Sequence, residues 1–151
     1  IEALVKSINK KLKSITWKPD LIITSYHGIP QSYFDKGDPY QCYCQKTTRL
    51  MKEKFQDVLI ETTFQSRFGP REWLKPYTDK TLEALPEQGK KNILMISPGF
   101  SSDCVETLEE LNIQGRESFM KNGGKNFDLV PCLNDNADHI NLFEKLVMKY
   151  I

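Results

Sequence analysis

A histidine at the end of an apolar run is the first feature of this sequence that suggests chemistry. His27 follows the run at residues 21–26, and Gly28 and Pro30 interrupt the chain directly afterwards. The pattern predicts a buried strand that ends at the imidazole, and ligands of parallel sheets collect outside the carboxyl ends of the strands. Because His139 is the only other histidine, His27 is the main candidate for acid/base or metal chemistry near neutral pH. A histidine that only forms a hydrogen bond at a strand end fits the pattern equally well.

Acidic residues follow the third apolar run, at the start of a predicted helix. At about 100° per residue, Glu106, Glu110 and Glu117 lie within roughly 40° of one another, with Gln114 on the same side. A solvated face has the same pattern, and Asp103 with Glu106 resembles a capping box. A carboxylate in the first helical turn, beside a strand-end histidine, can alternatively bind a metal or act as a general base.

Aromatic residues lie in the segments that follow the predicted strands, at Phe64, Phe68, Trp73 and Phe100. Aromatic side chains usually belong to a core. Several of these residues, however, lie in loops with glycine and proline rather than at core spacing. A large planar apolar ligand is therefore the alternative interpretation.

Helix and strand patterns alternate along the chain. The spacing predicts helices over residues 2–14, 39–55, 78–85, 103–123 and 137–150, and strands over residues 20–26, 58–64, 93–97 and 127–131. We therefore expect residues 1–151 to form a single α/β domain, with a four-stranded parallel sheet in the order 2-1-3-4 and helices on both faces. The helix after the third strand should bury an apolar side made of Val105, Leu108, Leu111 and Phe119. No glycine-rich nucleotide-binding motif follows any strand.

Composition excludes several classes of protein. The 21 basic residues nearly cancel the 20 acidic ones, so nucleic acid is not an expected partner. We expect neither a membrane span nor a signal peptide. The four cysteines, at positions 42, 44, 104 and 132, have poor spacing for zinc. Cys42 and Cys44 should lie on a helix, where residues two apart do not face each other. We expect reduced cytosolic thiols and no iron–sulfur cluster, which needs four converging thiolates.

Three segments of the chain resemble the ferrochelatase family. They are Ser25–Pro30 with Lys36–Tyr40 behind it, Phe64–Leu74, and Pro98–Leu111, and they occur in the family's order over nearly the whole chain. The resemblance implies a lyase that inserts ferrous iron into a porphyrin in the last steps of haem biosynthesis. It also implies one Rossmann-like half of a two-domain enzyme. This chain resembles the carboxyl-terminal half, and the amino-terminal half would supply the opposite wall of the active cleft.

The resemblance also assigns roles to individual residues. It implies that His27 and Glu106 are catalytic and contact the metal, that Glu110 belongs to a secondary acid path, and that the substrate contacts Tyr26, Ser66, Arg67 and Trp73. Some relatives carry histidine at the position of Cys104 and a carboxylate at that of Gln114, so the acid path is partly missing here. Fe²⁺ is expected as a substrate, and the cluster-bearing members hold their cysteines elsewhere.

Two alternatives remain open at the level of sequence. One is a related chelatase that loads cobalt or nickel into another tetrapyrrole, since side-chain chemistry does not settle the metal. The other is a non-catalytic tetrapyrrole-binding module, which would not need His27. The substrate can be protoporphyrin or a carboxylated precursor. We expect a cytoplasmic protein with a weak peripheral contact to the inner membrane. Alone, this half should be inactive and should self-associate through exposed apolar surface that includes Trp73.

Overall fold

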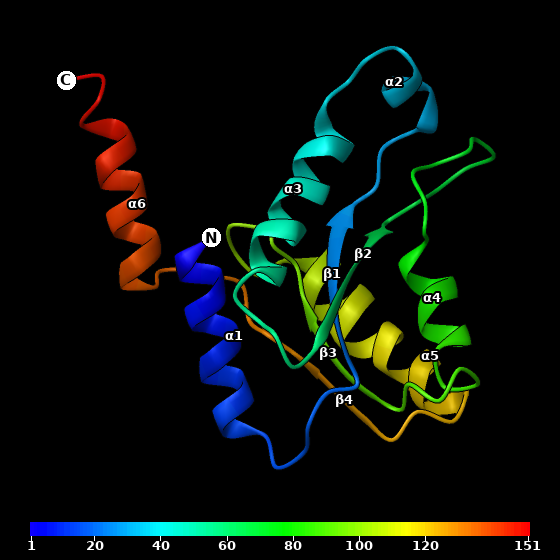
Figure 1. Cartoon of the computed structure of the whole chain (residues 1–151). Coiled ribbons are helices and arrows are strands. Elements are labelled where there is room, and N and C mark those ends of the chain that lie inside the picture. Colours follow the sequence, from blue (N-terminus) through cyan, green and yellow to red (C-terminus); the bar gives the residue numbers. More distant parts are fainter.

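Four parallel strands form one sheet at the centre of the protein. The computed structural model describes residues 1–151, and the strands are β1 (Leu21–His27), β2 (Leu59–Gln65), β3 (Asn92–Ile96) and β4 (Asn126–Leu129). Their order, β2-β1-β3-β4, confirms the predicted order (Figure 1). β1 pairs with β2 along its whole length, so His27 lies opposite Gln65 at the carboxyl end of the sheet.

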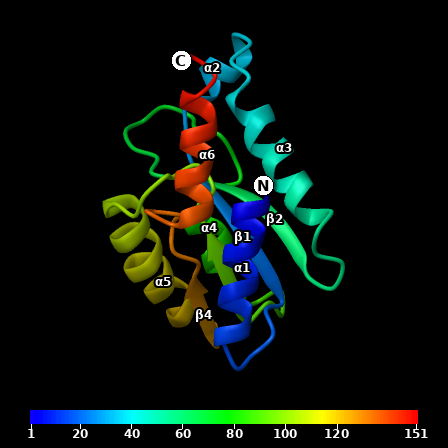
Figure 2. The ribbon, with the colours of Figure 1, turned by 90° about the vertical axis from the view of Figure 1, so that its left-hand side faces the viewer.

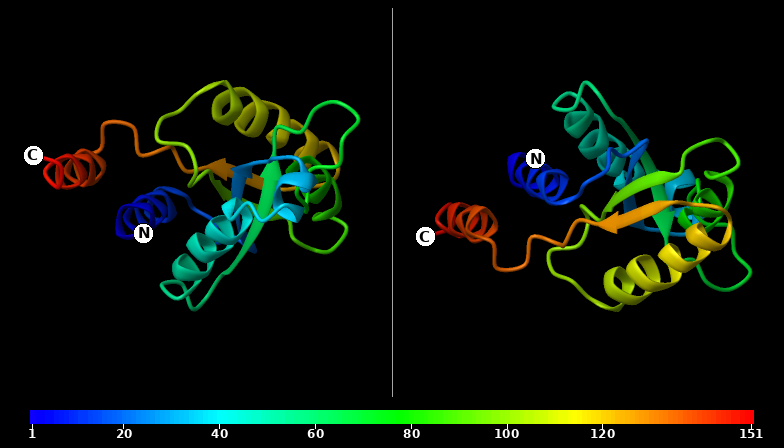
Figure 3. Two further views of the ribbon diagram at one scale, coloured as in Figure 1. Left: turned by 90° about the horizontal axis from the view of Figure 1, so that it is seen from above. Right: turned by 90° about the horizontal axis from the view of Figure 1, so that it is seen from below.

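Helices cover both faces of the sheet, as predicted. They are α1 (Glu2–Ser14), α2 (Gln31–Asp35), α3 (Tyr40–Lys52), α4 (Thr78–Ala84), the π-helix η1 (Glu106–Gly115), α5 (Arg116–Lys121) and α6 (Ala137–Val147). The views from above and below show α1 and α3 on one side of the sheet, and α4, η1 and α5 on the other (Figure 3). This architecture confirms the α/β class. None of the helices combines the length and apolar character that crossing a membrane requires.

Two apolar cores hold the sheet between these helix layers. Ile22 of β1 packs in one core with Ile8 of α1 and Met51 of α3. Its neighbour Ile23 belongs to the opposite core, with Leu111 of η1 among its other members. All five side chains are fully buried, and each such burial contributes about 1.5–3 kcal/mol to stability. β1 is therefore a rigid support for the histidine at its end.

The helix that follows β3 differs from the predicted α-helix. Over η1 the backbone hydrogen bonds join residues five apart, which changes the faces that the residues occupy. Thr107 and Leu111 are buried, whereas Val105 and Leu108 are 68% and 51% exposed. The prediction that Val105 and Leu108 belong to a buried apolar side is therefore wrong. It assumed α-helical spacing.

The start of this helix is not the capping box expected from Asp103 and Glu106. The Thr107 hydroxyl accepts the N–H of Cys104 at 2.9 Å, one position along from the expected pair. The Asp103 carboxylate instead accepts the N–H of Cys132 at 3.2 Å and the amide of Asn134 at 2.8 Å. Asp103 thus joins the loop after β3 to the segment after β4. Glu106 is left free of a capping role.

The segment between β1 and α3 contains one helix that the sequence pattern missed, the short α2. Asp38 supports the start of the next helix, because its Oδ1 accepts the N–H of Tyr40 at 2.9 Å. Cys42 and Cys44 lie on α3, as predicted, with Cys42 exposed and Cys44 buried. Burial raises the pKa of the Cys44 thiol to about 11. All four cysteines are free thiols.

Candidate active site

The loops that follow β1 and β2 are joined closely at the carboxyl edge of the sheet. The N–H of Gly28 donates to the carbonyl of Gln65 at 2.8 Å, and the N–H of Leu74 donates to the carbonyl of Ile29 at 3.0 Å. A Cβ atom at Gly28 would lie 2.9 Å from the Gln65 oxygen and 3.2 Å from the Trp73 ring. Only glycine fits this approach, which fixes the chain on either side of His27.

His27 presents one free ring nitrogen at this edge. Its Nδ1 lies 2.6 Å from the carbonyl oxygen of Gly28. Because a carbonyl only accepts, Nδ1 carries the hydrogen and Nε2 keeps its lone pair for a proton or a metal. The ring is half-buried between two aromatic rings, with centroid distances of 6.5 Å to Trp73 and 6.4 Å to Phe100. The Tyr40 hydroxyl donates to the His27 carbonyl at 2.8 Å and steadies the backbone.

Glu106 is the first residue of η1. A hydrogen bond from the Cys104 thiol lowers the pKa of its carboxyl, the Glu106 N–H lowers it further, and an electrostatic interaction with His27 adds to the effect. The carboxyl is therefore ionised throughout the neutral range. The influence of His27 means that the two side chains share one electrostatic environment at the edge of the sheet.

β1 and β3, the strands that lead to His27 and Glu106, are adjacent and parallel, as predicted. No direct hydrogen bond or ion pair joins the two side chains, and no group of three or more potential metal ligands converges in the structure. That the two residues share a passing metal ion or a water molecule stays a prediction.

Glu110 is held by the end of β2 rather than by the His27 loop. Its carboxylate accepts the N–H of Ser66 at 2.6 Å and the Ser66 hydroxyl at 2.5 Å. The buried amide of Gln65 donates to the same carboxylate at 3.2 Å and to the Glu106 carbonyl at 2.8 Å. Ser66 has a left-handed backbone with a φ of 64°, a conformation that non-glycine residues seldom adopt without support. Glu110 and Gln65 supply that support.

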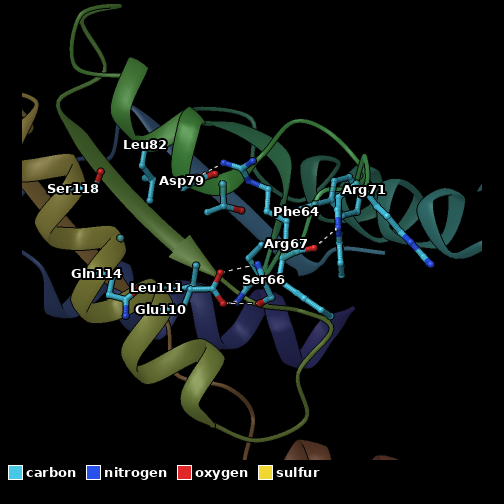
Figure 4. Close-up of a pocket in the computed structure, with 16 residues that line it drawn as sticks. Phe64, Ser66, Arg67, Arg71, Asp79, Leu82, Glu110, Leu111, Gln114 and Ser118 are labelled. Carbon is cyan, nitrogen blue, oxygen red and sulfur yellow. Dashed lines mark hydrogen bonds and ion pairs between the residues drawn. The ribbon is translucent and has the colours of Figure 1, made fainter. Parts of the chain in front are cut away.

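A pocket of about 420 Å³ opens beside this contact, between the loop after β2, the start of α4 and η1. Figure 4 shows Glu110 reaching Ser66 and Arg67 reaching Asp79 along its walls. Four of the predicted site residues line it: Ser66, Arg67, Trp73 and Glu110. His27 and Glu106 are not among the lining residues, so the structure divides the predicted site between the pocket and the neighbouring strand-end edge.

Tyr26 and Trp73 are less accessible than the sequence suggested. Tyr26 is 3% exposed, and its hydroxyl lies 3.1 Å from that of Thr48. Burial raises the Tyr26 pKa to about 12, and the structure places this side chain in the core instead of at the edge. Trp73 is 7% exposed because its ring packs against Gly28 and its Nε1 donates to the carbonyl of Phe68 at 3.0 Å. The expectation that Trp73 belongs to an exposed apolar surface is wrong.

Arg67 lies at the exposed mouth of the pocket. Its guanidinium donates to Asp79 at 2.8 Å and lies 4.3 Å from the centre of the Tyr77 ring. Hydrogen bonding to Asp79 raises the pKa of this guanidinium. Arg71 lines the same pocket and has no ion-pair partner. The mouth therefore carries cationic side chains that can meet an anionic group.

Sequence reasoning missed Gln65 and the role of Cys104 beside Glu106. Gln65 is 3% exposed and joins β2 to both η1 and β1, since its Oε1 also accepts the Ser25 hydroxyl at 2.8 Å. The one available signal was a long polar side chain at the end of a β-branched strand. The contact of Cys104 with Glu106 had no such signal, because it depends on the turn that precedes a π-helix.

Comparison with known proteins identifies the family of this chain. A family model described as Ferrochelatase matches residues 1–151. The chain belongs to the ferrochelatase family. It is 54% identical over 153 residues to a ferrochelatase of Rhizobium etli (strain CIAT 652) and 55% identical over 152 residues to one of Rhizobium meliloti (strain 1021). Each match covers 99% of this chain and 44% of the relative, so the chain spans less than half the length of the curated relatives it matches.

A solved structure supports the fold independently. A putative cobalamin biosynthesis CbiX protein from Marinobacter aquaeolei VT8 superposes with a TM-score of 0.54 at 12% sequence identity. The match covers 87% of this chain and 97% of that protein. At this identity the likeness concerns the arrangement of helices and strands alone.

Proposed function

We propose that this chain is the carboxyl-terminal half of a ferrochelatase and supplies the groups that help Fe²⁺ enter a porphyrin. The observation that carries the proposal is that His27, with Nε2 free, and the ionised Glu106 follow adjacent strands at the same carboxyl edge of the sheet. The family membership of the whole chain supports the same assignment. Iron is a substrate here, and we assign no iron–sulfur cluster.

The reaction needs a base and an anionic group, and this edge offers both. When Fe²⁺ binds the four nitrogens of a porphyrin, the two pyrrole N–H bonds break and two protons must leave. The His27 Nε2, whose lone pair is free, accepts one of them as a general base. The Glu106 carboxylate attracts the cation and relays the second proton to water.

Apolar and cationic side chains around this edge can contact the macrocycle and the carboxylates of a porphyrin. Trp73 and Phe100 flank His27, while Phe68 and Val105 are 77% and 68% exposed and offer apolar surface to the macrocycle. Arg67 at the pocket mouth binds a substrate carboxylate in exchange for Asp79. Ser66 shapes the loop between them, whereas Tyr26, buried in the core, supports the end of β1 and is not assigned a contact with the substrate.

Glu110 has a secondary role in the proposed reaction. Its carboxylate holds Ser66 and Gln65, so it serves as a secondary acid for a metal ion only after releasing them. The other half of the enzyme covers the porphyrin from the opposite side. We place the whole protein in the cytoplasm, with a peripheral contact to the inner membrane that brings it near an apolar substrate.

The test uses a full-length enzyme in which this chain replaces the matching segment of the Rhizobium meliloti ferrochelatase. Loss of a positioned base lowers rates by about 10²–10⁴-fold. We therefore expect His27→Ala to reduce Fe²⁺ insertion at least 100-fold, while porphyrin binding, followed by fluorescence quenching, changes less than threefold. Protoporphyrin and coproporphyrin are compared as substrates, and Co²⁺ is compared with Fe²⁺.

A second pair of variants tests the carboxylate. Glu106→Gln should lower insertion strongly, whereas Glu109→Gln, an exposed neighbour on the same helix, should stay within about twofold of the parent, as surface changes usually do. Full insertion activity of His27→Ala would show that His27 is not the base. Porphyrin binding without any metal insertion by the unsubstituted full-length protein would instead favour a module that only binds tetrapyrroles.

A further inference from the structure

A groove lined by basic and amide side chains runs along α3, on the side that faces away from the sheet. Its volume is about 700 Å³, and Phe34 of α2 contributes to its wall. Figure 2 shows α3 along the margin of the molecule, with α2 near its beginning. Long polar side chains of α3 make up most of the lining: Gln41, Gln45, Lys46, Arg49 and Lys52. None of these residues belongs to the candidate active site.

The groove carries positive charge that nothing in this chain neutralises. Lys46, Arg49 and Lys52 line it, and none of the lining residues is acidic. The whole of α3 contains no acidic residue. None of the three cations forms an ion pair, whereas other basic side chains of the protein do: Lys6, Lys11, Arg67, Lys75, Lys80 and Arg116. The groove therefore attracts an anion.

The spacing of the three cations brings like charges together. Lys46 and Arg49 are three residues apart, as are Arg49 and Lys52, and side chains at this spacing are neighbours on a helix. Neighbouring like charges destabilise a helix. The helix dipole favours Arg49 and Lys52, which lie in the last turn, but its effect does not reach Lys46. A bound anion would relieve this repulsion along the whole row.

Amide groups add neutral hydrogen-bond donors to the same side of the helix. Gln41, Gln45 and Arg49 follow one another at intervals of four residues, so they lie in one row. The hydrogen bonds that α3 side chains form within the protein come from Tyr40 and Thr48 alone. The donors of the groove are therefore available to a ligand that has several acceptor oxygens.

We propose that the groove along α3 binds a small polyanion, a molecule with two or more carboxylate or phosphate groups. Arg49, at the middle of the row, binds one group through two parallel hydrogen bonds, and Lys46 and Lys52 bind the groups on either side. The volume falls within the roughly 300–1,000 Å³ of small-molecule sites. An anionic membrane would need a broad apolar face, which the polar lining does not offer. The site is separate from the proposed chelatase centre and does not depend on it.

Calorimetric titration of the full-length enzyme described above tests this without measuring activity. Pyrophosphate and citrate are titrated separately, so that phosphate and carboxylate ligands can be told apart. We expect at least one of them to bind with a Kd below about 1 mM, and more weakly as the salt concentration rises. Cys42 is an exposed thiol in the groove and reports the position of the ligand. Its alkylation by iodoacetamide should slow at least threefold at saturation, while that of Cys104 should stay unchanged.

Two double variants with the same change in net charge assign the binding to the groove. Lys46→Gln combined with Arg49→Gln should raise the Kd at least tenfold. Lys10→Gln combined with Lys54→Gln removes two exposed cations outside the groove and should keep the Kd within about twofold. Equal Kd values in the two double variants, or no binding of either anion below about 10 mM, would overturn the proposal. So would binding of phosphatidylglycerol vesicles that requires Lys46 and Arg49 while both small anions fail to bind.

Discussion

Gly28 sets how closely the loops after β1 and β2 approach each other. A Cβ atom there would lie 2.9 Å from a backbone oxygen of Gln65, and the backbone can yield only by moving the end of β1. Gly28→Ala should therefore lower the free energy of unfolding by about 1–3 kcal/mol and displace His27. Gly99→Ala is the matched control, because its Cβ would meet Tyr26 at an ordinary 3.5 Å. Urea unfolding compares them, and equal losses would contradict this account.

The Cys104 thiol lowers the pKa of the Glu106 carboxyl. Its hydrogen bond is the main reason that the pKa of Glu106 lies below 4.5, and the stabilisation it gives is lost as the pH falls through the lowered value. Cys104→Val removes the donor and should raise the pKa towards 4.5, while Cys104→Ser retains a donor and should leave it low. An NMR titration of the Glu106 carboxyl measures both, and an unchanged pKa in the valine variant would disprove the role.

Single residues also show which features of the site could and could not be predicted from the sequence. The strand pattern placed His27 at the carboxyl edge because a buried run must end where glycine and proline interrupt it. It could not show that Tyr26 points into the core, since a strand buried on both faces has no polar side to reveal its orientation. The burial of Trp73 depends on contact with Gly28, which lies 45 residues away in the sequence.

Among the elements, η1 and β2 are joined through Glu110. Its carboxylate accepts hydrogen bonds from the backbone and hydroxyl of Ser66 and from Gln65. Since hydrogen bonds to a charged group contribute about 1.5–3 kcal/mol, Glu110→Ala should cost about 2 kcal/mol of unfolding free energy. Glu117→Ala, an exposed acid on α5, should cost less than about 0.5 kcal/mol. Similar midpoints in chemical denaturation would rule out the anchoring role.

The order of the strands can be predicted from the sequence, whereas the π-helical form of η1 cannot. Alternating strands and helices with right-handed crossovers leave few arrangements of four strands, so β2-β1-β3-β4 follows from the pattern. The π-helical backbone does not, because residues 105–111 also fit an α-helical pattern. Its geometry accompanies the contacts of Glu106 and Glu110 with Gln65, which are distant in sequence. Loss of those contacts is therefore expected to alter η1 before the sheet.

At the scale of the whole molecule, exposed apolar residues occur in several places. Two of these are the strand-end edge, where Phe68, Val105 and Leu108 are each more than half exposed, and one side of α6, where five large apolar residues are each 43–55% exposed: Ile140, Leu142, Phe143, Leu146 and Val147. Exposed patches of this kind mark interaction sites. The expected self-association of this chain remains a prediction, and it now concerns these residues instead of Trp73.

The 151-residue chain alone should insert metal poorly even though it folds. Its sheet and helix layers bury two cores, enough for an independent domain. The edge that carries His27 and Glu106, however, is covered by no second wall within this chain. Holding a porphyrin in one orientation and excluding water both require that wall, and correct positioning alone can contribute about 7–11 kcal/mol to lowering a barrier.

We therefore expect the isolated chain to insert Zn²⁺ or Fe²⁺ into protoporphyrin at least 1,000-fold more slowly than the full-length enzyme, about 4 kcal/mol at roughly 1.4 kcal/mol per tenfold change. Circular dichroism and cooperative urea unfolding establish that the chain is folded when it is assayed. Turnover is measured at several protein concentrations, so that activity from self-associated chains can be recognised by its concentration dependence. Equal turnover by folded, monomeric chain would show that the opposite wall plays no part in the reaction, and His27 and Glu106 would then act at an open surface.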